Sequence, residues 1–140
     1  MAAALGIDWG TKRSGFAITD ALRIALEPLA PQELAGEDEA LLDHIQSLLE
    51  ERVIDTLVLG LPLNMDGSEG PMAAAVRAFA ERLRARCPEP RLTLFDERLS
   101  TKEAEDWMRE AAIPVKKRRA IRDSASAAVI LRDWIAAGEP

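Results

Sequence analysis

The chain has 140 residues, the size of one ordinary globular domain, and its 48% apolar and 30% charged residues exclude intrinsic disorder. A single cysteine, Cys87, and a single histidine, His44, exclude a disulfide framework, a thiolate metal cage and a paired-histidine zinc site. The net charge of −6, taken over the whole chain, argues against a nucleic-acid partner, because phosphates are bound by lysine and arginine. We therefore expect any catalysis to rest on carboxylates, hydroxyls or lysines.

The ends of the chain carry no targeting signal. Residues 1–4 lead into the first apolar run without a basic stretch, and no run approaches the roughly 18 apolar residues of a membrane span. We predict a soluble, cytoplasmic protein with no membrane partner.

The first 52 residues predict three strands and a helix. Ala3–Asp8 and Ser14–Thr19 are short apolar runs on either side of a polar turn, which is typical of two paired strands. Residues 23–29 predict a third strand, at an edge of the sheet because Pro28 has no N–H to donate. Apolar residues then recur at helical spacing through residues 37–52, at Leu41, Leu42, Ile45, Leu48 and Leu49.

The next segment predicts a buried strand followed by a helix. Residues 54–61 form a continuous apolar run, as expected for a strand covered on both faces, and Pro62 ends it. After a loop rich in turn residues at 64–70, Pro71 is expected to be the first residue of a helix. Its predicted buried stripe consists of Met72, Ala75, Val76, Phe79 and Leu83.

The last third predicts a strand and two helices. Arg91–Glu97 is the strand, Ser100 and Glu103 form a capping box for the next helix, and Pro114 ends that helix. Asp123 is expected to open the final helix. The order β-β-β-α-β-α-β-α-α predicts an α/β domain with a mixed sheet, a meander of three strands followed by parallel crossovers.

Three groups of acids stand at the predicted ends of elements. Asp8 closes the first strand between glycines, an arrangement that suits a metal or phosphate site and equally a simple turn. Asp96 and Glu97 are adjacent and point to opposite faces of a strand, so periodicity leaves open which of them faces Asp8. Asp123 can be a helix cap, but it also lies on the helix stripe expected to face the sheet, four residues before Ala127.

The charges are divided unevenly along the chain. Residues 27–55 hold nine acids and one base, whereas residues 98–122 hold eight bases and four acids. Five of those bases lie in the seven residues 116–122, a run with no acid, which can be a solvated face or a binding surface. The basic segment adjoins Asp123, so the net charge of the whole chain does not exclude nucleic acid.

Four blocks of the sequence resemble the YqgF/RuvX family of pre-16S ribosomal RNA nucleases, also described as Holliday junction resolvases. They are Gly-Ile-Asp-Trp-Gly-Thr-Lys-Arg-Ser-Gly at 6–15, Gly-Leu-Pro-Leu-Asn-Met-Asp-Gly at 60–67, Asp-Glu-Arg-Leu-Ser-Thr at 96–101 and Asp-Ser-Ala-Ser-Ala at 123–127. The blocks follow one another in order, and the resemblance runs from about residue 5 to residue 134. Trp9 departs from the family, which more often has another large apolar residue there, but the acids are unaffected.

The resemblance implies an RNase H-like fold: a five-stranded mixed sheet of order 3-2-1-4-5 with helices on both faces, in one nuclease domain spanning residues 1–140. It further implies that Asp8, Glu97 and Asp123 are catalytic and hold metal, with Asp96 as a fourth candidate, and the choice of Glu97 rests on the resemblance alone. Oxygen-only ligands suit Mg²⁺ or Mn²⁺, and two such ions can catalyse phosphodiester hydrolysis.

The expected nucleic-acid contacts are basic side chains near these acids. They are Lys12, Arg13, Arg98, Lys116, Lys117, Arg118, Arg119 and Arg122. The implied activity is metal-dependent hydrolysis of RNA, in 5′-end maturation of pre-16S ribosomal RNA, by a monomer or a homodimer.

Three alternatives stay open. A junction resolvase would act on structured or branched DNA and would ordinarily need a dimer to place two cuts. A non-catalytic RNA-binding or ribosome-assembly factor could use the same fold. An ATPase related to actin and the sugar kinases would share the first phosphate loop, but 140 residues cannot supply its two lobes.

Overall fold

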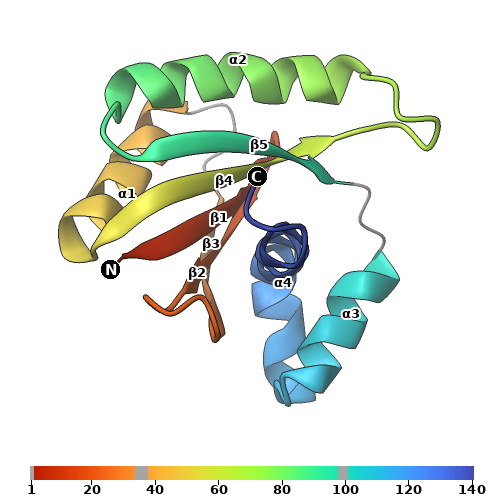
Figure 1. Cartoon of the computed structure of the whole chain (residues 1–140). Helices are drawn as coiled ribbons and strands as arrows, with labels where there is room; N and C mark the ends of the chain where they lie inside the picture. Colours follow the sequence, from red (N-terminus) through yellow and green to blue (C-terminus); the bar gives the residue numbers. More distant parts are fainter. Residues whose placement is uncertain (1, 34–37, 98–100) are drawn as a thin grey trace.

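The computed structural model describes residues 2–33, 38–97 and 101–140, so Arg98 and Ser100 lie outside the described residues. Its elements follow the predicted order (Figure 1). They are β1 (Ala3–Asp8), β2 (Ser14–Thr19), β3 (Leu26–Gln32), α1 (Asp38–Glu51), β4 (Ile54–Pro62), α2 (Pro71–Arg86), β5 (Arg91–Glu97), α3 (Thr101–Glu110) and α4 (Val115–Ala136).

The strands form one five-stranded sheet of order β3-β2-β1-β4-β5, which confirms the expected topology. β1 pairs antiparallel with β2 and parallel with β4, β4 is parallel to β5, and β3 pairs antiparallel with β2 at the edge. Because β1, β4 and β5 run in the same direction, their carboxyl ends meet at one edge of the sheet. The final residues of these strands, Asp8, Pro62 and Glu97, therefore stand along that edge.

α1 and α2 cover one face of the sheet. Their apolar stripes enclose a core with β1 and β4 in which Ile45, Phe79 and Leu83 are fully buried. Pro71 is the first residue of α2, as predicted. The buried stripe of α2 begins at Ala73, however, and the prediction for Met72 is wrong, because this side chain lies one position off the stripe and is 41% exposed.

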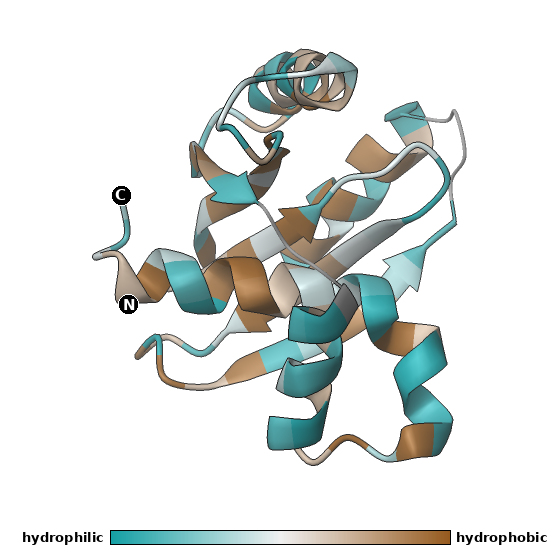
Figure 2. Cartoon of the chain, turned by 90° about the vertical axis from the view of Figure 1, so that its right-hand side faces the viewer, coloured by the Kyte–Doolittle hydropathy of each residue, from teal (hydrophilic) through white to brown (hydrophobic). Residues whose placement is uncertain are grey.

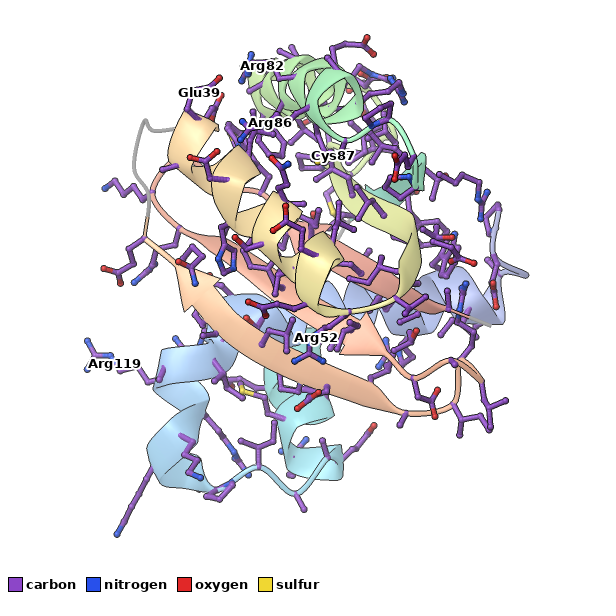
Figure 3. The ribbon with its side chains drawn as sticks, turned by 90° about the vertical axis from the view of Figure 1, so that its left-hand side faces the viewer. Glu39, Arg52, Arg82, Arg86, Cys87 and Arg119 are labelled. Atoms are coloured by element: carbon purple, nitrogen blue, oxygen red, sulfur yellow. The ribbon has the colours of Figure 1, made fainter. Side chains whose placement is uncertain are left out.

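Ion pairs between α1 and α2 account for part of the acidic surplus of the first half of the chain. Arg82 of α2 pairs with Asp38, and Arg86 pairs with both Glu39 and Asp43 of α1 (Figure 3). The negative charge of these α1 side chains is thus paired with the arginines of the neighbouring helix.

β3 begins later than predicted. The carboxylate of Asp20 accepts hydrogen bonds from the backbone N–H groups of Ile24, at 2.8 Å, and Ala25, and Arg23 has a positive φ of 61°. These contacts make a turn, so the strand starts at Leu26 and the predicted range 23–29 becomes Leu26–Gln32. Its place at the edge is as expected for a strand that contains proline.

α4 covers the other face, α3 packs against α4 (Figure 1), and α4 differs from the prediction. It begins at Val115, directly after Pro114, so Asp123 lies two turns inside the helix and does not cap it. The basic run contains no glycine or proline, and Ile121 packs into the core shared with α3, so the helix extends through the run. Pro114 precedes α4 and does not end α3, which already stops at Glu110 before Ala112 adopts a φ of 58°.

The N-terminal turns of α4 are hydrophilic and lie beside α3, whereas its C-terminal half packs on the sheet (Figure 2). This half contains the fully buried Trp134, and Trp107 of α3 is 7% exposed, so both indole rings belong to the core on this side of the sheet. Within the described residues, no helix is long and apolar enough to span a bilayer.

α4 touches the sheet most closely at Asp123 and Ser124. A Cβ built on Gly15 of β2 would lie 2.0 Å from the carbonyl oxygen of Asp123, so only glycine permits this approach. The buried Ser124 hydroxyl accepts a hydrogen bond from the N–H of Phe16, at 3.1 Å, and donates one to the carbonyl of Leu29. It bridges β2 and β3 where their register shifts, and it fixes the position of the adjacent Asp123.

Replacing Ser124 with alanine should destabilise the protein. The change leaves the Phe16 N–H and the Leu29 carbonyl without their buried partner, at a cost of about 2–4 kcal/mol. Urea unfolding followed by circular dichroism measures it. Ser126→Ala, at a half-buried position of the same helix, is the control and should cost less than about 1 kcal/mol. Equal losses in both variants would contradict the assigned role of Ser124.

Candidate active site

The alternation of side chains along the strands brings Asp8 and Glu97 to the same face of the sheet. Ile7 packs in the core beneath α1 and α2, so Asp8, the next residue, points toward α4. In β5, Leu94 packs on the α1 and α2 side and Phe95 on the α4 side, which directs Glu97 toward α4 as well. Asp96 is exposed and points to the opposite face. The structure thus places Glu97, and not Asp96, beside Asp8.

Gly60 leaves the space through which the Glu97 side chain reaches Asp8. β4 lies between β1 and β5, so the two carboxyl groups meet only if one side chain crosses β4. A Cβ on Gly60 of β4 would lie 2.4 Å from Glu97 Oε2 and 2.7 Å from Ile130 Cδ1. The Glu97 carboxyl group therefore occupies the space that a side chain at position 60 would fill.

Asp8 and Glu97 form a hydrogen-bonded carboxyl pair. Burial raises the pKa of Asp8 well above its usual value, and the charge of Glu97, the side-chain hydrogen bond between them and the charge of Asp123 raise it further. Burial also raises the pKa of Glu97, while the hydrogen bond to Asp8 acts in the opposite direction. These directions are those of a proton held on Asp8 and donated to the Glu97 carboxylate.

Asp123 approaches this pair from α4. Its charge acts on Asp8, and its Oδ2 lies 3.4 Å from Nε of Arg13, in an ion pair whose side chains are 59% exposed for Arg13 and 37% for Asp123. Across residues 2–33, 38–97 and 101–140, no three histidine, cysteine or acidic side chains stand close enough together to form a complete metal cluster. The structure therefore brings two of the predicted acids into contact and holds the third within electrostatic reach, paired with an arginine.

The donor set fits a divalent cation. All three side chains offer oxygen ligands, the kind that Mg²⁺ and Mn²⁺ prefer. Burial, followed by the negative charges of Glu97 and Asp123, raises the pKa of Asp8, which favours a proton on the carboxyl pair. A divalent cation bound between these side chains would neutralise the negative charge of the carboxyl groups more fully than a single proton can.

Lys12 and Arg13 lie on the exposed turn that follows Asp8. The N–H of Gly10 donates a hydrogen bond to the buried Ser14 hydroxyl at 3.2 Å, which closes the turn. Both cations are thereby presented at the sheet edge that carries Asp8.

The basic run is divided between two sides of α4. Lys116 and Arg119 precede Asp123 by seven and four residues, so they lie on its stripe of the helix. Arg118 donates to the Ile113 carbonyl at 3.0 Å, and Arg122 lies 3.7 Å from Glu105, so both point toward α3. The exposed Lys117 lies between these two groups.

Sequence reasoning missed Gly60 and Ser124. A glycine within a strand often marks a close approach of another group, so Gly60, inside the apolar run 54–61, offered a signal. Ser124 stands in the block at 123–127, but its role could not be predicted, because its two partners lie in strands more than 90 residues away along the chain.

Solved structures share this arrangement of sheet and helices. The fowlpox virus resolvase, determined with Holliday junction DNA, matches with a TM-score of 0.63 at 11% identity over 99% of both chains. RuvC of T. thermophilus, determined with a Holliday junction substrate, matches with a TM-score of 0.56 at 11% identity over 99% of this chain and 98% of that one. The likeness defines the class of the fold, which is RNase H-like as expected.

Sequence similarity gives the family. A protein of Anaeromyxobacter sp. (strain Fw109-5) that carries the name pre-16S rRNA nuclease is 45% identical over 131 residues, 94% of either chain. Residues 2–137 match the family described as "RuvX: Holliday junction resolvase". The chain belongs to the RuvX family, which confirms the resemblance drawn from the four blocks.

Alanine at position 60 should disturb the carboxyl pair while leaving the fold intact. The added Cβ meets the flexible end of Glu97, which can move away, and Asp8 then loses its hydrogen bond and a close negative charge. We expect the pKa of Asp8 to fall toward its ordinary value, measured by NMR titration of the carboxyl groups. Gly70→Ala is the control, because its Cβ would meet only Asn64, at 3.5 Å. An unchanged Asp8 pKa in Gly60→Ala would contradict the proposal that Glu97 reaches Asp8 through the space over Gly60.

Asp8→Asn should be more stable than the natural chain at neutral pH in the absence of divalent cations. Because folding raises the Asp8 pKa, the folded state binds the proton more tightly than the unfolded state, and stability falls as pH rises from the ordinary aspartate range through the raised value. The asparagine amide can donate to Glu97 without carrying charge. Urea unfolding at a series of pH values should show a difference in the free energy of unfolding between Asp8→Asn and the natural chain, and this gap should close in acid. A gap independent of pH would contradict this account.

Proposed function

We propose that this chain is a metal-dependent nuclease that hydrolyses phosphodiester bonds in RNA, in the 5′-end maturation of pre-16S ribosomal RNA in the cytoplasm, and that its 140 residues form one catalytic domain. The observation that carries the proposal is the carboxyl pair Asp8–Glu97, with Asp123 close by, at the sheet edge of a RuvX family member. The name of its relatives supports RNA as the substrate.

Asp8, Glu97 and Asp123 would hold Mg²⁺ or Mn²⁺, with two ions in the mechanism that we propose. When bound, the ions lower the pKa of the attacking water and neutralise charge on the leaving oxygen. The three carboxyl groups would bind the ions in their ionised form, so the proton that the raised Asp8 pKa favours would be released on binding.

Arg13 links the third acid to the substrate. Its ion pair with Asp123 is largely exposed, and exposed pairs of this kind contribute less than about 1 kcal/mol. A phosphate of the substrate can therefore replace the Asp123 carboxylate as the partner of the Arg13 guanidinium. The exchange frees the Asp123 carboxylate to join Asp8 and Glu97 and holds the phosphate beside them.

The remaining cations would position the sugar-phosphate backbone. Lys12 lies on the turn after Asp8, and Lys116 and Arg119 lie on the same stripe of α4 as Asp123. Lys117, Arg118, Arg122 and Arg98 extend this surface, and Arg98 lies outside the described residues. Contacts of this kind set the position of the nucleic acid and do not read its sequence.

A second candidate is cleavage of branched DNA. It is favoured by the description of the family and by structural neighbours determined with Holliday junctions. Paired cuts in a junction would require a homodimer, whereas cutting RNA needs only one site. A non-catalytic RNA-binding or assembly factor would bind the same substrates without cutting them.

Asp8→Asn should abolish cleavage and retain binding. Structured RNA, single-stranded RNA and four-way DNA junctions are incubated with each protein in Mg²⁺ or Mn²⁺, and cleavage is followed on denaturing gels. We expect a loss of at least about 100-fold, since residues that only support metal ligands already cost 10–100-fold. The substrate that the natural chain cuts identifies the activity.

Asp96→Asn is the matched control for this experiment. It removes an identical charge next to Glu97, but from the opposite face of the sheet, and should leave the cleavage rate within about twofold. Full activity of Asp8→Asn, or an equal loss in both variants, would overturn the assignment of the site.

A further inference from the structure

A pocket rich in arginine lies between α3 and α4, beside the candidate active site. It has a volume of about 290 Å³, and four arginines line it together with Glu105, Met108 and Val115. The arginines are Arg109 of α3 and Arg118, Arg119 and Arg122 of α4. Neither Lys116 nor Lys117 lines it. We call this site the arginine pocket.

The positive charge of this corner has no stabilising role in the helix itself. The first turns of α4 carry Lys116, Lys117, Arg118 and Arg119, with no acid in the first turn and no side-chain cap. Cations at the start of a helix are repelled by its dipole, and these cations also repel one another. An anion bound in the pocket would attract both the cations and the N-terminal end of the helix, and it would thereby offset both repulsions.

Three of the four arginines are available for an anion, while Arg118 donates its Nε–H to the Ile113 carbonyl. Arg109 pairs with Asp106 and Arg122 with Glu105, and the arginines of these pairs are 67% and 49% exposed. Exposed ion pairs are weak and exchange readily. Arg119 projects from α4 away from the body of the domain (Figure 3), and it has no hydrogen-bond or ion-pair partner within the described part of the chain.

We propose that the arginine pocket binds a phosphate group of the nucleic acid, distinct from the phosphate that is cut, and that Arg109 contacts it from α3. Guanidinium groups bind phosphate oxygens in pairs, which suits a pocket lined by arginines and not lysines. The identity of the polymer rests on the proposed function; the phosphate site does not. The phosphate can come from within a strand or from its 5′ end.

The spacing of the helix places this phosphate a few nucleotides from the cut. The pocket's α4 arginines precede Asp123 by one to five positions, which at 1.5 Å per residue extends about 7.5 Å along the axis. A strand advances about 3.4 Å per nucleotide in a duplex. A strand that follows α4 would thus place the bound phosphate about two nucleotides from the position of Asp123.

The test measures binding without cleavage. A fluorescent 12-nucleotide single-stranded RNA is titrated with the natural chain, Arg109→Ala and Arg109→Lys at several salt concentrations, with no divalent cation. Arg109→Ala should weaken binding about tenfold, as expected for a charged hydrogen bond, and lower the salt slope by about 0.7. Arg109→Lys should recover the salt slope but only part of the affinity.

Arg84→Ala is the matched control. Arg84 pairs with Glu81 three residues earlier on α2, as Arg109 pairs with Asp106 on α3, but it lines none of the pocket. It should bind like the natural chain. Circular dichroism confirms folding of each variant. Unchanged binding by Arg109→Ala, or an equal loss in Arg84→Ala, would overturn the proposal.

Modified RNA distinguishes the two sources of the phosphate. One set of RNAs carries a neutral methylphosphonate at one position each, and a second pair carries a 5′-phosphate or a 5′-hydroxyl. A single position whose neutralisation weakens the natural chain but not Arg109→Ala assigns an internal phosphate; a 5′-phosphate effect lost in Arg109→Ala assigns the terminal one. If neither the methylphosphonate nor the 5′-phosphate has such an effect, the proposed phosphate site is wrong. Because no cleavage is measured, failure of the proposed nuclease activity would be seen separately.

Discussion

The contact between the carboxyl groups of Asp8 and Glu97 is the constraint on which the rest of the site depends. Two acids that would separate in water are held together because their strands end at the same edge and because Gly60 leaves room over the strand between them. Burial raises the pKa of Asp8, and repulsion from the Glu97 charge raises it further. The repulsion is tolerated because the surrounding fold fixes both backbones, and it creates a place that favours a cation.

The third acid depends on how closely α4 approaches the sheet. Gly6 and Gly15 remove the side chains that would hold the helix away, and Ser124 ties it to β2 and β3. Asp123 therefore stands beside Asp8 as part of a buried packing arrangement, while the turns before it extend past the sheet edge with their cations. The same helix thus contributes an acid to the site and basic residues to its surroundings.

Much of the site and fold could be predicted from the chain. The apolar runs fixed the order of the elements, and four blocks of residues indicated the topology and the acids. The boundaries were less predictable: periodicity alone did not show that α4 begins at Val115, because the basic run lacks both a helix breaker and a regular apolar stripe. The direction of the Glu97 side chain depended on which face of β5 meets α4, a property of the whole sheet.

The sequence by itself determined the class of fold and the family and predicted the acids of the site, because these follow from local patterns of hydrophobicity and from motifs read along the chain. Only the tertiary structure decided that Asp96 points away, that Arg13 pairs with Asp123 and that Arg109 joins the cations of α4. Each of these relations joins separate elements. Their distances are set by packing between a sheet and its helices, and spacing along the chain does not encode them.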